Sequence, residues 1–102
     1  MARLEGKTAM IIGGGSGIGK ATALAFAREG AQLVVAEIRK EIAEALAEEI
    51  ENQGGEALPF ETDVSDETQV DATVRDGLER FGKIDILVNS AGGGSTRDGP
   101  VT

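Results

Sequence analysis

The sequence contains no cysteine, histidine, tyrosine or tryptophan, and its only aromatic residues are three phenylalanines. Without cysteine, the chain has no disulfide framework and no thiol chemistry. Without cysteine and histidine together, it has neither a Cys/His metal site nor a Ser-His catalytic triad. We therefore expect no metal site, and we take a cytoplasmic location as the default.

Long apolar segments are also lacking. No run approaches the roughly 18 apolar residues that a membrane-spanning helix needs, so no membrane partner is expected. Residues 1–12 do not resemble a signal peptide, because Glu5 interrupts a short apolar stretch. A chain of 102 residues with 40% hydrophobic residues is typical of one small globular domain.

Basic residues are scarce as well. The chain carries 10 basic and 18 acidic residues, which gives a net charge of −8. Residues 37–67 hold 11 acidic side chains against Arg39 and Lys40. Such a balance argues against nucleic acid as a partner, because phosphates require a basic surface. The acidic excess is interpreted as a solvated helix face.

Strand-like and helix-like segments alternate along the chain. Four strands are predicted at residues 7–12, 32–37, 57–63 and 83–89, and three helices at residues 18–29, 39–53 and 66–81. This β-α-β-α-β-α-β order predicts an α/β fold with a parallel sheet and right-handed crossovers. We expect a partial, doubly wound Rossmann-type sheet with strand order 3-2-1-4, with Pro59 on an edge strand.

The predicted helices have apolar stripes and identifiable ends. Ser65 is the expected N-cap of the third helix, and glycines at 30, 54–55 and 82 are expected to end the three helices. The residues expected to face the sheet are Ile18, Thr22, Ala25 and Phe26 in the first helix, Ile42, Ala43, Leu46, Ala47 and Ile50 in the second, and Val70, Val74, Leu78 and Phe81 in the third.

A glycine cluster separates the first strand from the first helix. The N–H groups and dipole at a helix N-terminus attract an anion, and glycine lets the backbone approach a pyrophosphate. The spacing is G-x-x-x-G-x-G rather than the usual G-x-G-x-x-G, and a turn without a ligand stays possible. The residues predicted to bind a cofactor here are Gly13, Gly15, Ser16, Gly17, Ile18 and Gly19.

Glu37 ends the second predicted strand, 18 residues after Gly19. An acidic residue at about this spacing binds the adenosine ribose in dinucleotide-binding folds. A carboxylate there would accept hydrogen bonds from the ribose hydroxyls and repel a 2′-phosphate, so we expect NAD rather than NADP. The alternative is a surface glutamate that opens an acidic helix.

Asp63 and Val64 lie at the C-terminal end of the third predicted strand, where open α/β sheets bind ligands. Asp63 can accept a hydrogen bond from the adenine amino group, and Val64 can flank the ring. Alternatively, Asp63 is a second helix cap beside Ser65.

Asn89, Ala91 and Gly92 lie where the fourth predicted strand ends. The Asn89 amide can connect neighbouring strand ends, and the two small residues leave room for a ribose. A simple turn at the end of the strand would look similar.

Taken together, residues 5–102 resemble the N-terminal half of the short-chain dehydrogenase/reductase family. The glycines fit its T-G-x-x-x-G-x-G loop, residues 63–64 its D-V, and residues 89–92 its N-N-A-G. Two positions depart from these motifs, because Ile12 replaces the Thr and Ser90 replaces the second Asn. That Thr usually hydrogen-bonds near the fourth strand, so we expect this link to be lost and the site to be slightly looser.

The resemblance also implies what the chain lacks. Family members are longer and carry a catalytic Ser and a Tyr-x-x-x-Lys motif in their second half. This chain has no Tyr, so we assign no catalytic residue to it. Residues 1–102 are interpreted as a truncated NAD-binding Rossmann half-domain, with residues 93–102 as a loop or tail.

Two functions follow from the resemblance. In the first, the chain is the NAD(H)-binding portion of an oxidoreductase that transfers hydride between a secondary alcohol or ketone and NAD. In the second, it is a truncated nucleotide-binding module or an inert remnant without catalysis. An acidic interaction domain without a nucleotide is a third possibility.

We also expect the chain to self-associate. The third helix should cover the opposite face of the sheet from the first two, which would leave apolar sheet exposed on one face. Association is then expected through the open edge of the fourth strand or through the missing C-terminal half.

Overall fold

The computed structural model describes residues 3–13 and 17–90 of the chain. Strands and helices alternate in the predicted order, with boundaries that differ from the sequence prediction by at most three residues. The elements are β1 (Thr8–Ile12), α1 (Gly17–Arg28), β2 (Gln32–Glu37), α2 (Lys40–Asn52), β3 (Glu56–Glu61), α3 (Glu67–Phe81) and β4 (Ile86–Asn89).

The four strands form one parallel sheet in the order β3-β2-β1-β4. The predicted α/β Rossmann-type fold and its strand order are therefore confirmed. β1 lies between β2 and β4, and all of its residues are buried. Pro59 lies on the edge strand β3, as predicted, where its missing N–H removes no hydrogen bond from the centre of the sheet.

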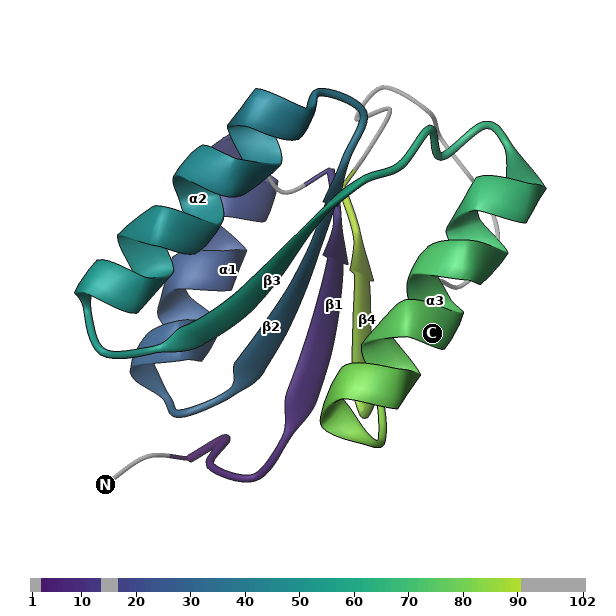
Figure 1. Ribbon diagram of the computed structural model, residues 1–102. Coiled ribbons are helices and arrows are strands. Elements are labelled where there is room, and N and C mark those ends of the chain that lie inside the picture. The colour runs from purple at the N-terminus through teal and green to yellow at the C-terminus, as the bar shows by residue number, and fades with distance from the viewer. Residues whose placement is uncertain (1–2, 14–16, 91–102) are drawn as a thin grey trace.

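Helices cover both faces of the sheet. Figure 1 shows α1 and α2 together on one face and α3 on the other. Successive strand residues point to opposite faces, so β1 contributes Ala9 and Ile11 to the first layer and Met10 and Ile12 to the second. The chain thus has two small cores, one on each side of the central strands.

The inner face of α2 matches the sequence prediction. Ala43, Leu46, Ala47 and Ile50 are all buried against the sheet, as their helical spacing indicated, whereas Ile42, also expected on this face, is only half-buried. The acidic residues of α2 are exposed on its other side, as predicted, except Glu49, which is half-buried and pairs with Lys20 of α1.

The inner face of α1 differs from the prediction. Ile18 was expected in the core, but its side chain is 77% exposed, and the buried residues of this helix are Gly19 and Ala23. Each residue is rotated by about 100° from its neighbour, so the buried face begins one position later than the apolar pattern indicated. Close approach of α1 to β1 favours the smallest residues of the helix over the largest.

The third helix also differs in two details. Its N-cap is Asp66 rather than Ser65, because the Asp66 carboxylate accepts hydrogen bonds from the N–H groups of Thr68 and Gln69. Leu78 was expected in the core but is 42% exposed, while Thr73 and Gly77 are buried.

The buried residues of α3 explain this orientation. A Cβ atom at Gly77 would lie 3.0 Å from Cγ2 of Val34, so the glycine lets the helix approach β2 closely. The Thr73 hydroxyl lies 2.6 Å from that of Thr62, which joins α3 to the end of β3. The helix therefore faces the sheet with its small residues, as α1 does.

We predicted that apolar residues of the sheet would be exposed on one face, and in the structure this exposure is limited to β4. Beneath α3, Met10, Val34 and Ala36 are all buried. Leu87 of β4 is 48% exposed and pairs in register with Met10, so it lies on the same face of the sheet. Within residues 3–13 and 17–90, no helix has the length and hydrophobicity that crossing a membrane requires.

Candidate functional site

Parallel pairing brings the carboxyl ends of all four strands to one edge of the sheet. The register aligns Ile12 with Ala36 on one side and with Asn89 on the other, and aligns Glu37 with Glu61. The chain leaves β1 toward α1 on one face, whereas α3, which precedes β4, lies on the other. This change of direction between β1 and β4 is the topological switch point at which open α/β sheets bind ligands.

The turn after β1 requires glycine at its first position. Gly13 has a φ of 81°, a left-handed conformation that other residues rarely adopt. Its N–H donates a hydrogen bond of 2.7 Å to the carbonyl oxygen of Ala36, so the turn is held against the end of β2. The backbone path toward α1 is thus fixed at its start.

The predicted glycines of α1 have different surroundings. A Cβ atom at Gly19 would overlap with the carbonyl oxygen of Gly13 and with Oγ of Ser90, whereas nothing lies within 4 Å of a Cβ at Gly17. Gly19 is therefore required for packing, while Gly17 leaves open space at the helix N-terminus. Ile18 lies between them and is exposed at the same end of α1. Gly15 and Ser16, also predicted to bind the cofactor, lie outside the described residues.

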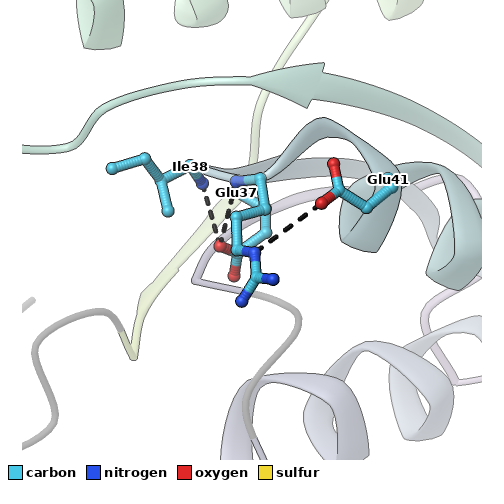
Figure 2. A network of polar contacts seen from close by, with 4 residues as sticks. Glu37, Ile38 and Glu41 are labelled. Carbon is cyan, nitrogen blue, oxygen red and sulfur yellow. Dashed lines mark hydrogen bonds and ion pairs between the residues drawn. The ribbon is translucent and has the colours of Figure 1, made fainter.

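Glu37 ends β2, and the backbone that follows orients its carboxylate. Oε1 accepts hydrogen bonds from the N–H of Ile38 at 2.9 Å and of Arg39 at 3.4 Å. Figure 2 shows the Glu37 carboxylate beside Ile38, with Glu41 nearby. The Arg39 guanidinium pairs with that Glu41, with Nε 3.7 Å from Oε2.

Asp63 lies in the turn after β3. Its Oδ1 accepts hydrogen bonds from the N–H of Ser65 at 3.0 Å and from the Ser65 hydroxyl at 2.6 Å. These two bonds lower the pKa of Asp63, so its carboxylate is ionised at neutral pH. Asp63 orders the turn before α3, but the cap of that helix is Asp66, so the alternative of Asp63 as a helix cap is wrong. Val64, next to it, is partly exposed.

Asn89 and Ser90 end β4 beside the turn at Gly13. Asn89 is aligned with Ile12, and its side chain is exposed. Ser90 continues the pairing, because its N–H donates to the carbonyl oxygen of Ile12 at 2.9 Å. Ala91 and Gly92, predicted to make room for a ribose, lie outside the described residues.

The Ser90 side chain makes a contact that the sequence analysis missed. Its hydroxyl lies 3.0 Å from the carbonyl oxygen of Ile12 and 3.0 Å from that of Gly13. The link between β1 and β4, expected to be lost with Ile12, is therefore present and comes from the other strand. A short hydroxyl side chain next to a glycine turn was the available signal, but sequence spacing alone did not indicate its partners.

The predicted binding residues that the structure describes thus meet at one edge. Gly13, Gly17, Gly19, Glu37, Asp63 and Asn89 all lie at the carboxyl ends of strands or in the segments that follow them. Within the described part of the chain, no three His, Cys, Asp or Glu side chains are grouped so that they could hold a metal ion.

The family model described as short chain dehydrogenase matches residues 7–102. The chain belongs to this family. A 3-oxoacyl-acyl-carrier-protein reductase of Thermotoga maritima is 45% identical over 96 residues, which are 94% of this chain and 38% of that protein. The 7alpha-hydroxysteroid dehydrogenase of Escherichia coli K12 is 42% identical over 95 residues, 93% of this chain and 37% of that protein.

Solved structures of the family have the same fold. A hydroxysteroid dehydrogenase from Escherichia coli superposes with a TM-score of 0.83 at 41% identity, over 86% of this chain and 37% of that one. A 7alpha-hydroxysteroid dehydrogenase complexed with NADH and 7-oxo glycochenodeoxycholic acid gives the same TM-score and identity, over 86% and 34%. The chain spans less than two fifths of the length of these relatives.

Proposed function

We propose that this chain is the NAD(H)-binding portion of a short-chain dehydrogenase/reductase-like oxidoreductase. In the complete enzyme, hydride would pass between NAD and a secondary alcohol or ketone. The observation that carries the proposal is the meeting of the Gly13 turn, the N-terminus of α1, Glu37 and Asp63 at the switch point of the sheet. A solved relative with NADH bound is a further support.

Each group at this edge has chemistry that suits one part of a dinucleotide. The open space at Gly17 and the helix N-terminus behind it suit the pyrophosphate. Glu37 suits the hydroxyls of the adenosine ribose, and the ionised Asp63 suits the adenine amino group, with Val64 against the ring. Ala91 and Gly92 would leave room for a ribose, and the Asn89 amide would connect the strand ends beside it. Gly15, Ser16 and Ile18 are assigned to the phosphate loop. The bound nicotinamide would carry the hydride.

The orientation of Glu37 favours NAD over NADP. Its carboxylate is held at the end of β2 by two backbone N–H groups and would repel a 2′-phosphate at short range. A carboxylate held in this orientation suits the two ribose hydroxyls, which can donate hydrogen bonds to it, and suits a 2′-phosphate poorly.

Titration with NADH and NADPH, followed by nicotinamide fluorescence, tests the proposal. The wild-type protein should bind NADH more tightly, and Glu37→Ser should shift the preference toward NADPH by at least about tenfold. Glu48→Ser removes the same charge from an exposed position of α2 and should leave the preference unchanged. Equal binding of both dinucleotides by the wild-type protein would contradict the role of Glu37.

Catalysis is assigned to residues outside this chain. The 102 residues contain no tyrosine, so the general acid/base that the resemblance implies is absent from them. The second candidate is therefore a nucleotide-binding module, or an inert remnant, without activity of its own. NADH binding without turnover of any secondary alcohol would favour the module, and an absence of binding would favour the remnant.

The proposed setting of the protein follows from the same features. We take the cytoplasm as its location by default, since the chain has no disulfide framework that would require an oxidising compartment. We also infer that it associates with a second copy or with further sheet through the edge of β4, which is partly apolar at Leu87.

A further inference from the structure

We propose that Ser90 is a positioning residue for dinucleotide binding, and that its hydroxyl replaces the link which Ile12 cannot make. This inference rests on the proposed function, because it assigns Ser90 to the same site. Ser90 belongs to neither the glycine cluster nor the set of residues predicted to bind the cofactor. The assignment follows from its contacts with the two ends of the phosphate loop.

The first contact is with the start of the loop. The Ser90 hydroxyl lies 3.0 Å from two successive carbonyl oxygens, those of Ile12 and Gly13. A hydroxyl has one proton, so it donates to either oxygen or is shared between them. Together with the bond from the Ser90 N–H to Ile12, this fixes the end of β1 against the end of β4 at two points.

The second contact is with the end of the loop. Oγ of Ser90 and the carbonyl oxygen of Gly13 both lie where a Cβ atom of residue 19 would be. The first turn of α1 therefore rests directly on the Ser90 hydroxyl and on the turn after β1. The Ser90 side chain thus contacts both Gly13 and the position of Gly19, where the two ends of the loop approach each other.

The separation of these two glycines matters for an anion. Backbone N–H groups bind phosphate only when the helix N-terminus is at the right distance and angle. The Ser90 proton also reduces the negative potential of two carbonyl oxygens beside the proposed phosphate position. Loss of the hydroxyl would leave both oxygens less well satisfied and the loop ends less firmly joined.

The side chain of Ile12 explains why Ser90 has this role. The aliphatic side chain of Ile12 has no hydrogen-bonding group, and it packs in the core beneath α3, where it is only 6% exposed. The resemblance implies a Thr at this position that bonds toward the fourth strand. In this chain the bond is made in the reverse direction, from a β4 side chain to the β1 backbone.

The test compares Ser90→Ala with Thr73→Val in the full chain. Both substitutions remove one hydroxyl that makes an internal hydrogen bond, but Thr73 lies in α3 and contacts Thr62 and Gln69 rather than the loop. We measure the Kd for NADH by fluorescence and the midpoint of urea unfolding for each variant. Ser90→Ala should raise the Kd about five- to tenfold, and Thr73→Val should lower the midpoint with a Kd within about twofold of wild type.

The outcomes separate the two proposals. NADH binding by wild type with an unchanged Kd in Ser90→Ala would overturn the role of Ser90 alone. Equal weakening by both variants would also overturn it, because the effect would then be a general loss of stability. Failure of the wild-type protein to bind NADH or NADPH would overturn the proposed function and the role of Ser90 together.

Discussion

Two glycines in the first turn of α1 differ in what surrounds them, and this difference can be measured. Gly19→Ala places a methyl group against the backbone of Gly13 and the hydroxyl of Ser90, and the backbone atom cannot move away easily. We expect a loss of about 1–3 kcal/mol in the free energy of unfolding, from overpacking. Gly17→Ala has open space and should leave stability unchanged or raise it by up to about 1 kcal/mol.

Substitutions at the same two positions should affect NADH affinity and the free energy of unfolding differently. Gly17→Ala is expected to weaken NADH binding while the protein stays stable, because its methyl group would occupy the space proposed for the pyrophosphate. Urea unfolding and NADH titration on each variant provide both measurements. If the Gly17→Ala protein binds NADH as tightly as wild type, the phosphate binds elsewhere. A Gly19→Ala protein with unchanged stability would contradict the packing described for α1.

Asp85 gives the stability of the sheet a dependence on pH. Its carboxylate accepts a hydrogen bond of 2.9 Å from the N–H of Thr8 and lies 3.3 Å from Nζ of Lys83. The pKa of Asp85 is lowered in the folded protein. The hydrogen bond from Thr8 is the largest cause, and the contact with Lys83 lowers the pKa further. The stabilisation is therefore complete above the pKa of the unfolded chain and is lost as the pH falls through the lower folded value.

Asp85→Asn should remove this part of the pH dependence. The wild-type protein should lose stability below about pH 4, and the variant should lose less over the same interval. Urea midpoints at pH 7 and pH 3 measure the difference. Glu48→Gln is the control, since Glu48 is an exposed acidic residue of α2, and an equal effect of both substitutions would contradict the assignment to Asp85.

At the scale of the elements, two leucines with opposite surroundings test the orientation of the helices. Leu46 of α2 is buried in the larger core, whereas Leu78 of α3 is substantially exposed. Leu46→Ala should cost about 2–5 kcal/mol of the free energy of unfolding, which is enough to unfold a marginal domain. Leu78→Ala should cost under about 1 kcal/mol, because little apolar surface is lost.

Denaturant unfolding of the two variants measures this difference. A cost under about 1 kcal/mol for Leu46→Ala would contradict the position of α2. A large cost for Leu78→Ala would favour the orientation of α3 that the apolar pattern had indicated.

The elements and their order could be predicted because they depend on local patterns. Alternation of apolar segments with glycine-ended helices is enough to indicate β-α-β units, and the charge pattern of α2 identifies its outer face. The rotation of α1 and α3 could not be predicted in the same way. Close contact with the sheet selects Gly19, Ala23 and Gly77, which have the least hydrophobic signal.

The candidate site was predictable where it depends on position along a strand. Glu37 and Asp63 lie at the expected edge because each is the last residue of a predicted strand. The Asp66 cap and the contacts of Ser90 were missed for a different reason. Several polar side chains near a turn can satisfy the same backbone groups, and only the folded geometry selects one; for Ser90 the partner Ile12 is 78 residues away.

At the scale of the whole molecule, the outer edge of β4 should determine self-association. β4 pairs with β1 on one side, and Leu87 contributes exposed apolar surface to this strand. Leu87→Glu should lower the apparent mass in size-exclusion chromatography at high protein concentration, because a charge on an edge strand opposes pairing.

Ile38→Glu is the control for this substitution. Ile38 is also an exposed apolar residue, but it follows β2 and lies away from the β4 edge. Its variant should behave like the wild-type protein. A wild-type protein that stays monomeric at all concentrations would contradict association through β4.

The central position of β1 has a consequence for synthesis on the ribosome. β1 is made first and receives β2 soon afterwards, but its other neighbour, β4, is separated from it by two further helices and a strand. At about 5–20 residues per second, the second edge of β1 waits about 4–15 s for its partner. During that interval the most buried of these four strands is an open template, and an early encounter with another nascent chain would occur there rather than at β4.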